Sequence, residues 1–239
     1  RVHIYKVESP VKDKLESLGL LLRSLGDQST IVFLNYRDSV ERTNKYLVEQ
    51  GFSTSFFHGG LEQKEREASL YRFSNGSANI LVSTDLASRG LDIPDIDNII
   101  HYHMPESEDG YIHRVGRTAR WEAQGRAFFL LGPEEHIPDY VDAEVEDYEI
   151  PAVEELPMPA KPKMATLYIG KGKKDKISKG DILGFLCKKG GLNSSEIGKI
   201  DVNDRYAYAA IARPKLRSVL NNVKGEKIKG VKTIVEEVR

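Results

Sequence analysis

Apolar and polar positions in residues 1–132 follow an order that predicts strands alternating with helices. Short, almost wholly apolar runs predict buried strands at 30–34, 54–57, 79–83, 98–103 and 126–131. Between them, helical spacing predicts helices at 38–50, 62–73 and 106–120, and a first helical face made of Val11, Leu15, Leu18, Leu22 and Leu25. Apolar strands separated by helices indicate an α/β fold, in which helices cover both faces of a parallel sheet.

The pattern is different in residues 164–239. Strands are predicted at 166–170, 196–202, 205–212 and 231–238, and helices at 178–189 and 214–223. Ser178 and Asp181 form a capping pair at the start of the first of these helices. The resulting βαββαβ order predicts a small sheet with two helices on one face.

The stretch between these blocks, residues 133–163, has no strand or helix pattern. Residues 134–162 contain five prolines, and residues 133–160 contain ten Asp/Glu and no Lys/Arg. Such a segment cannot form a core of its own, so we predict a linker, part of which can still pack on either neighbour. The predicted domains are therefore 1–132 and 164–239, joined by 133–163.

Composition excludes several classes of protein. A hydrophobic content of 40% in 239 residues is enough for packed cores, which argues against global disorder. No apolar run approaches the ~20 residues that span a bilayer, so we expect no membrane partner. The single cysteine, Cys187, leaves no disulfide framework and favours a cytoplasmic location. Since the first residue is arginine, we expect the chain to be part of a longer protein.

Charge is distributed unevenly along the chain. Residues 1–132 hold 16 Lys/Arg and 18 Asp/Glu, a net charge of −2, and residues 133–160 have a net charge of −10. Residues 161–239 hold 19 Lys/Arg and 8 Asp/Glu, a net charge of +11. A basic module behind an acidic connector predicts nucleic-acid binding at the C-terminal end.

The most concentrated candidate chemistry is the stretch HRVGRTAR, residues 113–120. Arg114, Arg117 and Arg120 recur every third residue, so on a helix they would share one side and could bind an anion. The alternative is a solvated helix end. Gly116 within the predicted helix argues against that alternative, since glycine there costs about 1 kcal/mol relative to alanine.

Several segments in register resemble the motifs of the second RecA-like domain of DEAD-box RNA helicases. They are IVFLNYR, HGGLEQKER, STDLASRGLDIPDIDNIIHY and YIHRVGRTAR, and the resemblance covers about residues 1–132. It implies a RecA-like sheet for this domain. It also implies the roles of particular residues, because each matches a position in a motif of the family.

On this resemblance, Arg117 and Arg120 reach the ATP phosphates from across the cleft, and His113 and Arg114 couple the two RecA-like domains. Asp92 lies near the nucleotide ribose, with Gly90 close by. The group implied to hold the RNA backbone is Arg37, Gly59, Gln63, Arg66 and Thr84.

This sequence departs from the family pattern at a few positions. Ala119 replaces a common glycine, Trp121 replaces a small residue, and Gly60 stands where aspartate is frequent. Tyr-His-Met-Pro at 102–105 replaces a common Tyr-Asp-Leu-Pro. None of these changes removes a charged group that the resemblance assigns to ATP.

No GxxxxGK[ST] phosphate-binding loop and no Asp-Glu-Ala-Asp motif occurs in the chain. We therefore expect ATP with Mg²⁺ to be held mainly by a first RecA-like domain outside this sequence, which would be a partner of this one. No metal site is predicted within the chain itself. We also expect the chain alone to be inactive in ATP hydrolysis.

Residues 164–239 resemble the C-terminal RNA-binding domain of the DbpA subfamily. The resemblance implies an RRM-like fold that grips a hairpin of large-subunit ribosomal RNA during ribosome assembly. We expect phosphate contacts from lysines, namely Lys171, Lys173, Lys174, Lys188 and Lys189. Tyr206 and Tyr208 lie in a degenerate RNP1 pattern and are candidates for base stacking, although they could equally cover the sheet surface.

The predicted function is therefore the C-terminal part of an ATP-dependent DEAD-box RNA helicase, an ATP hydrolase that remodels structured RNA. Two alternatives stay open. One is a non-catalytic RNA-binding protein in which the RecA-like domain is only a scaffold, and the other is a general RNA chaperone without a defined target.

Overall fold

The structure is a computed structural model that describes residues 2–91, 93–119 and 124–239. It consists of two compact units. The first contains residues 1–73 and 79–161, and the second contains residues 162–239 together with the short segment 74–78.

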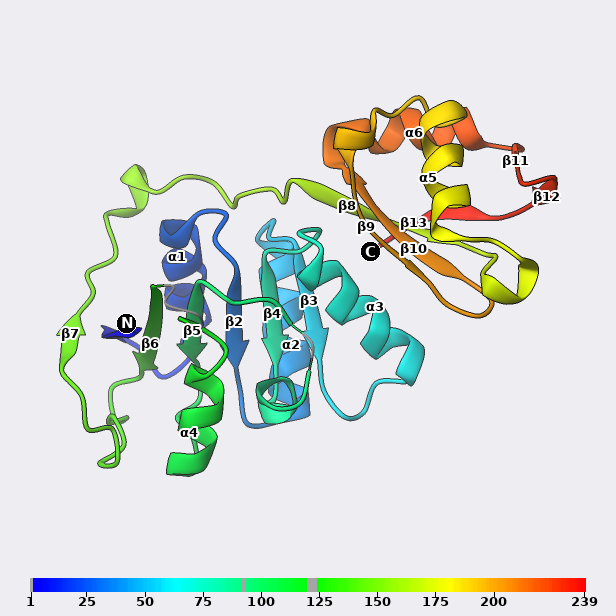
Figure 1. The fold of residues 1–239 in the computed structure, drawn as a ribbon. Coiled ribbons are helices and arrows are strands. Elements are labelled where there is room, and N and C mark those ends of the chain that lie inside the picture. The colour runs from blue at the N-terminus through cyan, green and yellow to red at the C-terminus, as the bar shows by residue number, and fades with distance from the viewer. Residues whose placement is uncertain (1, 92, 120–123) are drawn as a thin grey trace. The chain divides into compact units, whose positions relative to one another are not determined.

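The first unit is built on a seven-stranded sheet in the order β3-β4-β2-β5-β6-β1-β7 (Figure 1). Every neighbouring pair of strands is parallel. The strands are β1 (Val2–Glu8), β2 (Thr30–Phe33), β3 (Thr54–Phe57), β4 (Ile80–Ser83), β5 (Asn98–His101), β6 (Gly125–Leu131) and β7 (Val145–Asp147). The helices are α1 (Leu15–Leu25), α2 (Arg37–Glu49), α3 (Gln63–Ser74) and α4 (Glu108–Val115), with short 3-10 turns at Asp85–Ser88 and Val153–Glu155.

Separate apolar clusters pack on the two faces of this sheet. Leucines of α1 and the buried residues Val40 and Leu47 of α2 pack with Val32, Val82 and Phe128 on one face. On the other face, Phe73 of α3 and Val115 of α4 pack with neighbouring strand residues. The predicted α/β fold with helices on both faces is confirmed.

In this unit, one strand was missed and two local predictions were wrong. The first strand, β1, was not predicted at all. Val11 is 55% exposed and lies before α1, which begins at Leu15. The helix predicted at 106–120 ends at Val115, because Gly116 is its C-cap and the chain then turns so that Ile96 N–H donates to Arg117 O at 3.0 Å. Arg117 therefore does not share a helical face with Arg114.

The acidic stretch after β6 is partly ordered against the first unit. Within it, β7 pairs with β1, and Tyr148 N–H donates to Lys6 O at 2.9 Å. The Tyr148 ring packs edge-on against Phe128, with 5.1 Å between the ring centroids. The segment predicted as a linker thus contributes an edge strand and an aromatic side chain to the first unit.

The second unit is a four-stranded antiparallel sheet in the order β13-β8-β10-β9. Its strands are β8 (Met164–Ile169), β9 (Ile197–Val202), β10 (Ala207–Ala212) and β13 (Val235–Val238). Its helices are α5 (Lys179–Lys188) and α6 (Leu216–Val223), and a hairpin of β11 (Lys227–Ile228) and β12 (Val231–Lys232) precedes the last strand. Short 3-10 turns occur at Lys173–Asp175, Ser194–Glu196 and Arg213–Lys215.

The core of this unit lies between the sheet and its two helices. Ile182 and Phe185 of α5 and Val219 of α6 pack with Ala207, Ala209 and Ile211 of β10. The predicted RRM-like βαββαβ unit is confirmed. Among the described residues, no helix is long and apolar enough to cross a membrane.

Candidate functional site

Several of the residues predicted to act in the first unit lie at the carboxyl ends of its parallel strands. Arg37 follows β2, Gly59 follows β3, and Thr84 follows β4. Helix α4, which carries His113 and Arg114, begins after β5. This edge is where open parallel sheets bind ligands, because loops there diverge around the strand ends.

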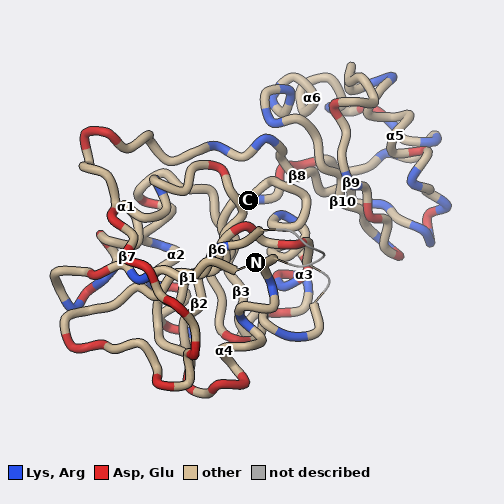
Figure 2. The backbone as a smooth tube through the Cα atoms, turned by 60° about the vertical axis from the view of Figure 1, so that its left-hand side comes forward, with Lys and Arg blue, Asp and Glu red and all other residues tan. Residues whose placement is uncertain are grey.

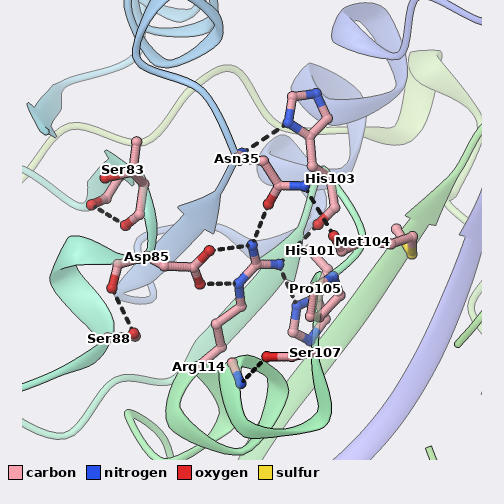
Figure 3. A network of polar contacts seen from close by, with 12 residues as sticks. Asn35, Ser83, Asp85, Ser88, His101, His103, Met104, Pro105, Ser107 and Arg114 are labelled. Atoms are coloured by element: carbon pink, nitrogen blue, oxygen red, sulfur yellow. Dashed lines mark hydrogen bonds and ion pairs between the residues drawn. The ribbon is translucent and has the colours of Figure 1, made fainter. Parts of the chain in front are cut away.

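Arg114 is at the centre of a polar network at this edge (Figure 3). Its guanidinium forms a bidentate pair with Asp85, with Nε to Oδ1 at 2.6 Å and Nη2 to Oδ2 at 3.0 Å. Nη2 also donates to Asn35 Oδ1 at 2.8 Å, and Nη1 donates to His103 O at 2.8 Å and His101 Nδ1 at 3.3 Å. Arg114 is fully buried.

The two histidines of this network are held neutral. Burial, followed by the charge of Arg114, lowers the pKa of His101 well below its usual value. His101 Nδ1 must accept from Arg114, since arginine has only donors, so its proton lies on Nε2. Burial, followed by the charge of Lys14, lowers the pKa of His103 to about 4, and His103 Nδ1 accepts from Asn35 N–H at 2.9 Å.

Arg37, Gly59 and Arg66, three of the predicted RNA-contact residues, lie together beside β3. The guanidinium of Arg37 rests against Gly59, where a Cβ atom would lie 2.8 Å from Arg37 Nη2. Arg66 fixes the same turn by donating to Gly59 O at 2.7 Å and Leu61 O at 3.0 Å. Gln63 is exposed at the start of α3, with its Nε2 3.4 Å from Glu67 Oε1.

Sequence reasoning missed the buried residue that shapes this turn, His58. Its Nδ1 accepts from Gly60 N–H at 3.0 Å, and its Nε2 lies 3.1 Å from Glu41 Oε2 on α2. The only sequence signal was a histidine directly before two glycines.

Thr84 directly follows β4. Its N–H donates to Phe57 O at 3.3 Å, and its Oγ1 accepts from Leu86 N–H at 3.4 Å. The side chain therefore caps the 3-10 turn that begins at Asp85. Thr84 and Gly59 thus follow adjacent strands at one edge of the sheet.

The segments predicted to contact ATP also come together. Arg117 Nη1 donates to Leu91 O at 3.4 Å, which holds the arginine against the segment that contains Gly90. Gly90 has φ of +63°, a conformation that favours glycine, and a Cβ there would meet no described atom within 4 Å. Asp92 and Arg120 lie outside the described residues.

His113 lies on α4, where its Nε2 is 3.4 Å from Asp109 Oδ1. Asp109 also pairs with Arg89, and that hydrogen bond lowers the pKa of the Asp109 carboxyl. These side chains are exposed or half-buried. His113 is therefore accessible from solvent, in contrast to Arg114.

Gly125, at the start of β6, determines how closely the segment after α4 can pack. A Cβ on Gly125 would overlap Thr118 Oγ1 and would lie 2.9 Å from Ala119 N. Ala119 has φ of +55°, in the left-handed region that costs an alanine about 1–2 kcal/mol. Glycine, which is common in the family where this chain has Ala119, would adopt this conformation without that cost.

In the second unit, the candidate tyrosines lie on the face of β10 opposite the helices. Tyr206 and Tyr208 are joined there by Tyr168 of β8, which sequence reasoning missed. The Tyr168 and Tyr206 rings are stacked at 5.9 Å, and Tyr208 contacts them edge-on at 6.0 and 5.6 Å. Tyr168 pairs directly across the strands with Tyr208.

The predicted phosphate-contact lysines differ in what they touch. Lys171, Lys173 and Lys174 lie on the loop before α5, and Lys174 Nζ is 3.8 Å from Asp204 Oδ2. Lys188 and Lys189 are both exposed, and Lys189 Nζ lies 3.3 Å from Glu226 Oε2 and donates to Lys227 O at 2.9 Å. Figure 2 shows basic positions around α5 and α6 and acidic positions along the stretch that contains β7.

The loop that carries these lysines has a fixed backbone. Lys173 N–H donates to Asn203 O and Lys174 N–H to Asp204 O, both at 2.8 Å. A Cβ on Gly172 would overlap the Asn203 carbonyl oxygen, so only glycine allows this approach.

Two family models match the chain in separate places. The helicase conserved C-terminal domain matches residues 13–122, and the DbpA RNA binding domain matches residues 166–237. In the crystal structure of the Escherichia coli DEAD-box protein SrmB bound to RraA, the similar chain is 30% identical. That match covers 68% of this chain and 98% of the other, with a TM-score of 0.58.

The chain belongs to the DEAD-box RNA helicase family.

Two curated DEAD-box relatives align with nearly all of the chain. ATP-dependent RNA helicase DbpA of Escherichia coli is 35% identical over 93% of this chain and 50% of the relative. DbpA of Bacillus subtilis is 30% identical over 92% of this chain and 51% of the relative. The chain spans about half the length of these relatives. It contains the C-terminal part of a DEAD-box helicase, followed by a DbpA-type RNA-binding domain.

The DEAD-box architecture is also seen in a solved archaeal structure. A DEAD box protein from Methanococcus jannaschii is 27% identical over 62% of this chain and 42% of the other, with a TM-score of 0.57. Within the part of this chain that the structure describes, no three His, Cys, Asp or Glu side chains form a group that could hold a metal ion.

Proposed function

We propose that the whole protein is an ATP-dependent RNA helicase that binds and remodels structured RNA, with large-subunit ribosomal RNA as the target during ribosome assembly in the cytoplasm. The observation that carries this proposal is that different parts of the chain hold the residues assigned to ATP and those assigned to RNA. The first unit holds the Arg37–Gly59–Arg66 group at the carboxyl ends of its strands and ties Arg117 to the segment that contains Gly90, and a separate basic unit follows.

On this proposal, the chain completes an ATP site whose phosphate-binding loop belongs to the first RecA-like domain. Arg117 and Arg120 would meet the phosphates, and Gly90 and Asp92 would meet the ribose end. Bound Mg²⁺-ATP supplies the transferable phosphoryl group. Arginines at that position stabilise charge that spreads over the phosphate oxygens, an effect of roughly 10³–10⁵ in rate where it has been measured.

The packing of Arg117 against the Leu91 carbonyl supports this assignment. That hydrogen bond ties the arginine to the segment that contains Gly90, so both would approach one ligand together. Among the described residues, no atom lies within 4 Å of a Cβ built on Gly90, which is consistent with a ligand lying against its backbone.

The RNA part of the proposal rests on charge and on aromatic rings. The net charge of +11 in residues 161–239 favours phosphate contact, because neutralising phosphates releases counterions. The fixed loop that carries Lys171, Lys173 and Lys174 would present these charges in one place. Tyr168 and Tyr206 are half-buried and offer ring faces on which unpaired bases could stack, whereas Tyr208 is buried beside them.

The catalytic part is tested in the full-length protein with Arg117→Ala. We expect RNA-stimulated ATP turnover to fall by roughly 10²-fold or more, while RNA binding is retained. Arg42→Ala is the control, because Arg42 is an exposed arginine that pairs with Asp13 at 2.7 Å. Unchanged turnover in Arg117→Ala would favour the scaffold alternative.

The RNA part is tested with the triple variant Lys171→Ala/Lys173→Ala/Lys174→Ala of this chain. The slope of log K against log[salt] should shrink by about 0.7–0.9 for each lost phosphate contact. Lys215→Ala/Lys224→Ala/Lys232→Ala removes the same charge from exposed positions of the same unit and should leave most of the slope. Equal effects of the two triple variants would refute a specific lysine loop. A hairpin of large-subunit ribosomal RNA compared with an unrelated hairpin tests the target and separates it from general chaperone activity.

A further inference from the structure

The resemblance implies that Arg114 couples the two RecA-like domains, and the structure shows that its side chain forms its hydrogen bonds inside the first unit. We infer that Arg114 is a positioning residue that ties the RNA-contact segments to the segment carrying Arg117. We call Arg114, Asp85, Asn35, His101 and His103 the Arg114 clamp. This inference rests on the proposed function.

The clamp uses the whole hydrogen-bonding capacity of Arg114. A guanidinium has five N–H donors, and all five point to acceptors within this unit (Figure 3). The side chain is fully buried, and the Phe33 ring lies 5.2 Å from its central carbon. An external phosphate could bind Arg114 only if several of these hydrogen bonds were broken.

The acceptors come from three strand ends that are far apart in sequence. Asn35 follows β2, Asp85 follows β4, and His101 and His103 lie at and after the end of β5. In the sheet, β2 lies between β4 and β5. One buried side chain on α4 therefore fixes three adjacent strand ends relative to one another.

Residues of the clamp lie next to residues that have proposed roles. Asp85 directly follows Thr84, and Asn35 is two residues before Arg37. On the other side, the carbonyl oxygen of Arg114 accepts from Arg117 N–H at 3.2 Å. A shift of the RNA-contact segments would therefore move α4 and, with it, the backbone of Arg117.

The hydrogen bonds of the clamp require arginine at position 114 and neutral imidazole rings at His101 and His103. Lysine has three donors that cannot form the planar, bidentate pair with Asp85 and also reach Asn35, His101 and His103. A protonated His101 would present a donor to the guanidinium in place of its acceptor Nδ1. A positive charge at position 114 is therefore not enough to form the clamp, which also needs the planar N–H donors of arginine and a neutral His101.

The first experiment is hydrogen–deuterium exchange of this chain with Asp85→Asn. Asparagine keeps the size of the side chain but removes the charge that is paired with a buried guanidinium. We expect exchange to become about tenfold faster or more in segments 34–37, 84–88 and 117–119, because the buried Arg114 guanidinium loses the charge of its half-exposed partner, Asp85. Asn35→Ala, which removes one acceptor, should act in the same direction with a smaller effect.

Asp13→Asn is the matched control, because Asp13 forms an exposed pair with Arg42 in the same unit. It should leave exchange in the three segments unchanged. Faster exchange at 84–88 without any change at 117–119 would overturn the link to Arg117, and a uniform increase over the whole unit would overturn the clamp as a local device.

The second experiment uses RNA-stimulated ATP turnover of the full-length protein. Asp85→Asn should raise the RNA concentration for half-maximal stimulation by about tenfold to 100-fold, because misplaced contact groups lose affinity for RNA. The KM for ATP without RNA should change less than twofold. A merely structural defect would lower turnover with the half-maximal RNA concentration unchanged, and that result would refute the positioning role. If the wild-type protein hydrolyses no ATP, the proposed function fails, and the exchange data still decide whether the clamp exists.

Discussion

Gly125→Ala tests whether the segment that carries Arg117 depends on close packing against β6. The added methyl would overlap Thr118 Oγ1 and would lie 3.1 Å from Ala119 Cβ. Overpacking of this kind costs about 1–3 kcal/mol. The Thr118 hydroxyl also donates to Ile96 O, and losing that hydrogen bond costs a further ~0.5–1.5 kcal/mol. The free energy of unfolding should therefore fall by about 1.5–4.5 kcal/mol.

Gly19→Ala is a control of opposite sign within the same unit. Gly19 lies in α1, and a Cβ there would make ordinary contact with Tyr46 at 3.6 Å. Replacing a helical glycine should raise stability by about 0.5–1 kcal/mol. The two variants therefore make the same chemical change with opposite expected effects.

Urea denaturation followed by circular dichroism distinguishes these expectations. With an m-value near 2 kcal/mol/M, the midpoint should fall by about 0.8–2.2 M in Gly125→Ala and rise by about 0.3–0.5 M in Gly19→Ala. Hydrogen exchange at Thr118 and Ala119 shows whether the segment has moved away without global unfolding. An unchanged midpoint together with unchanged exchange would refute the packing argument.

Three further predictions concern backbone conformation, pH and the lysine loop. Ala119→Gly should raise the free energy of unfolding by about 1 kcal/mol in urea denaturation, since it relieves a positive φ, and an unchanged midpoint would contradict this. Because burial lowers the pKa of His103 from 6.5 to about 4, the unfolded state binds more protons than the folded state in that range. Stability should therefore fall as pH drops from 6.5 to 4, and His103→Gln should flatten that slope in unfolding experiments. Gly172→Ala should weaken RNA binding by this chain without removing a charge, and wild-type affinity in a filter-binding assay would contradict the fixed loop.

The strands that sequence patterns predicted best are those covered on both faces. Runs such as 30–34 and 79–83 are almost wholly apolar, because helices pack on both sides of the central strands. The first strand, β1, mixes Val2, Ile4 and Val7 with charged or polar residues, and it pairs near one edge of the sheet. Its pattern is therefore weaker, and its identity depends on pairing with β6, which is more than 100 residues away.

The candidate site could be predicted as separate motifs but not as an arrangement. Family resemblance supplied Arg37, Gly59 and Arg66 one by one, and the structure adds that they meet at a single turn. His58 and Glu41 could not be found in this way, because their contact joins residues from two elements and leaves no local pattern. Tyr168 was missed for the same reason, since only strand pairing brings it opposite Tyr208.

The arginines of HRVGRTAR show why a cluster of charges in sequence is a poor guide to where those charges act. Three arginines in eight residues suggest one anion-binding surface. However, α4 ends at Val115, so the chain turns between Arg114 and Arg117, and the two side chains do different work. Arg114 turns inward, where Asp85 compensates its charge, and Arg117 lies against the Leu91 carbonyl. Because Asp85 neutralises the charge of Arg114, Arg114 does not repel Arg117 as two arginines on one exposed surface would. On the proposed function, Arg117 can then face phosphate while its N–H stays hydrogen-bonded to the carbonyl oxygen of Arg114, whose side chain contacts the strand ends beside the residues proposed to hold RNA.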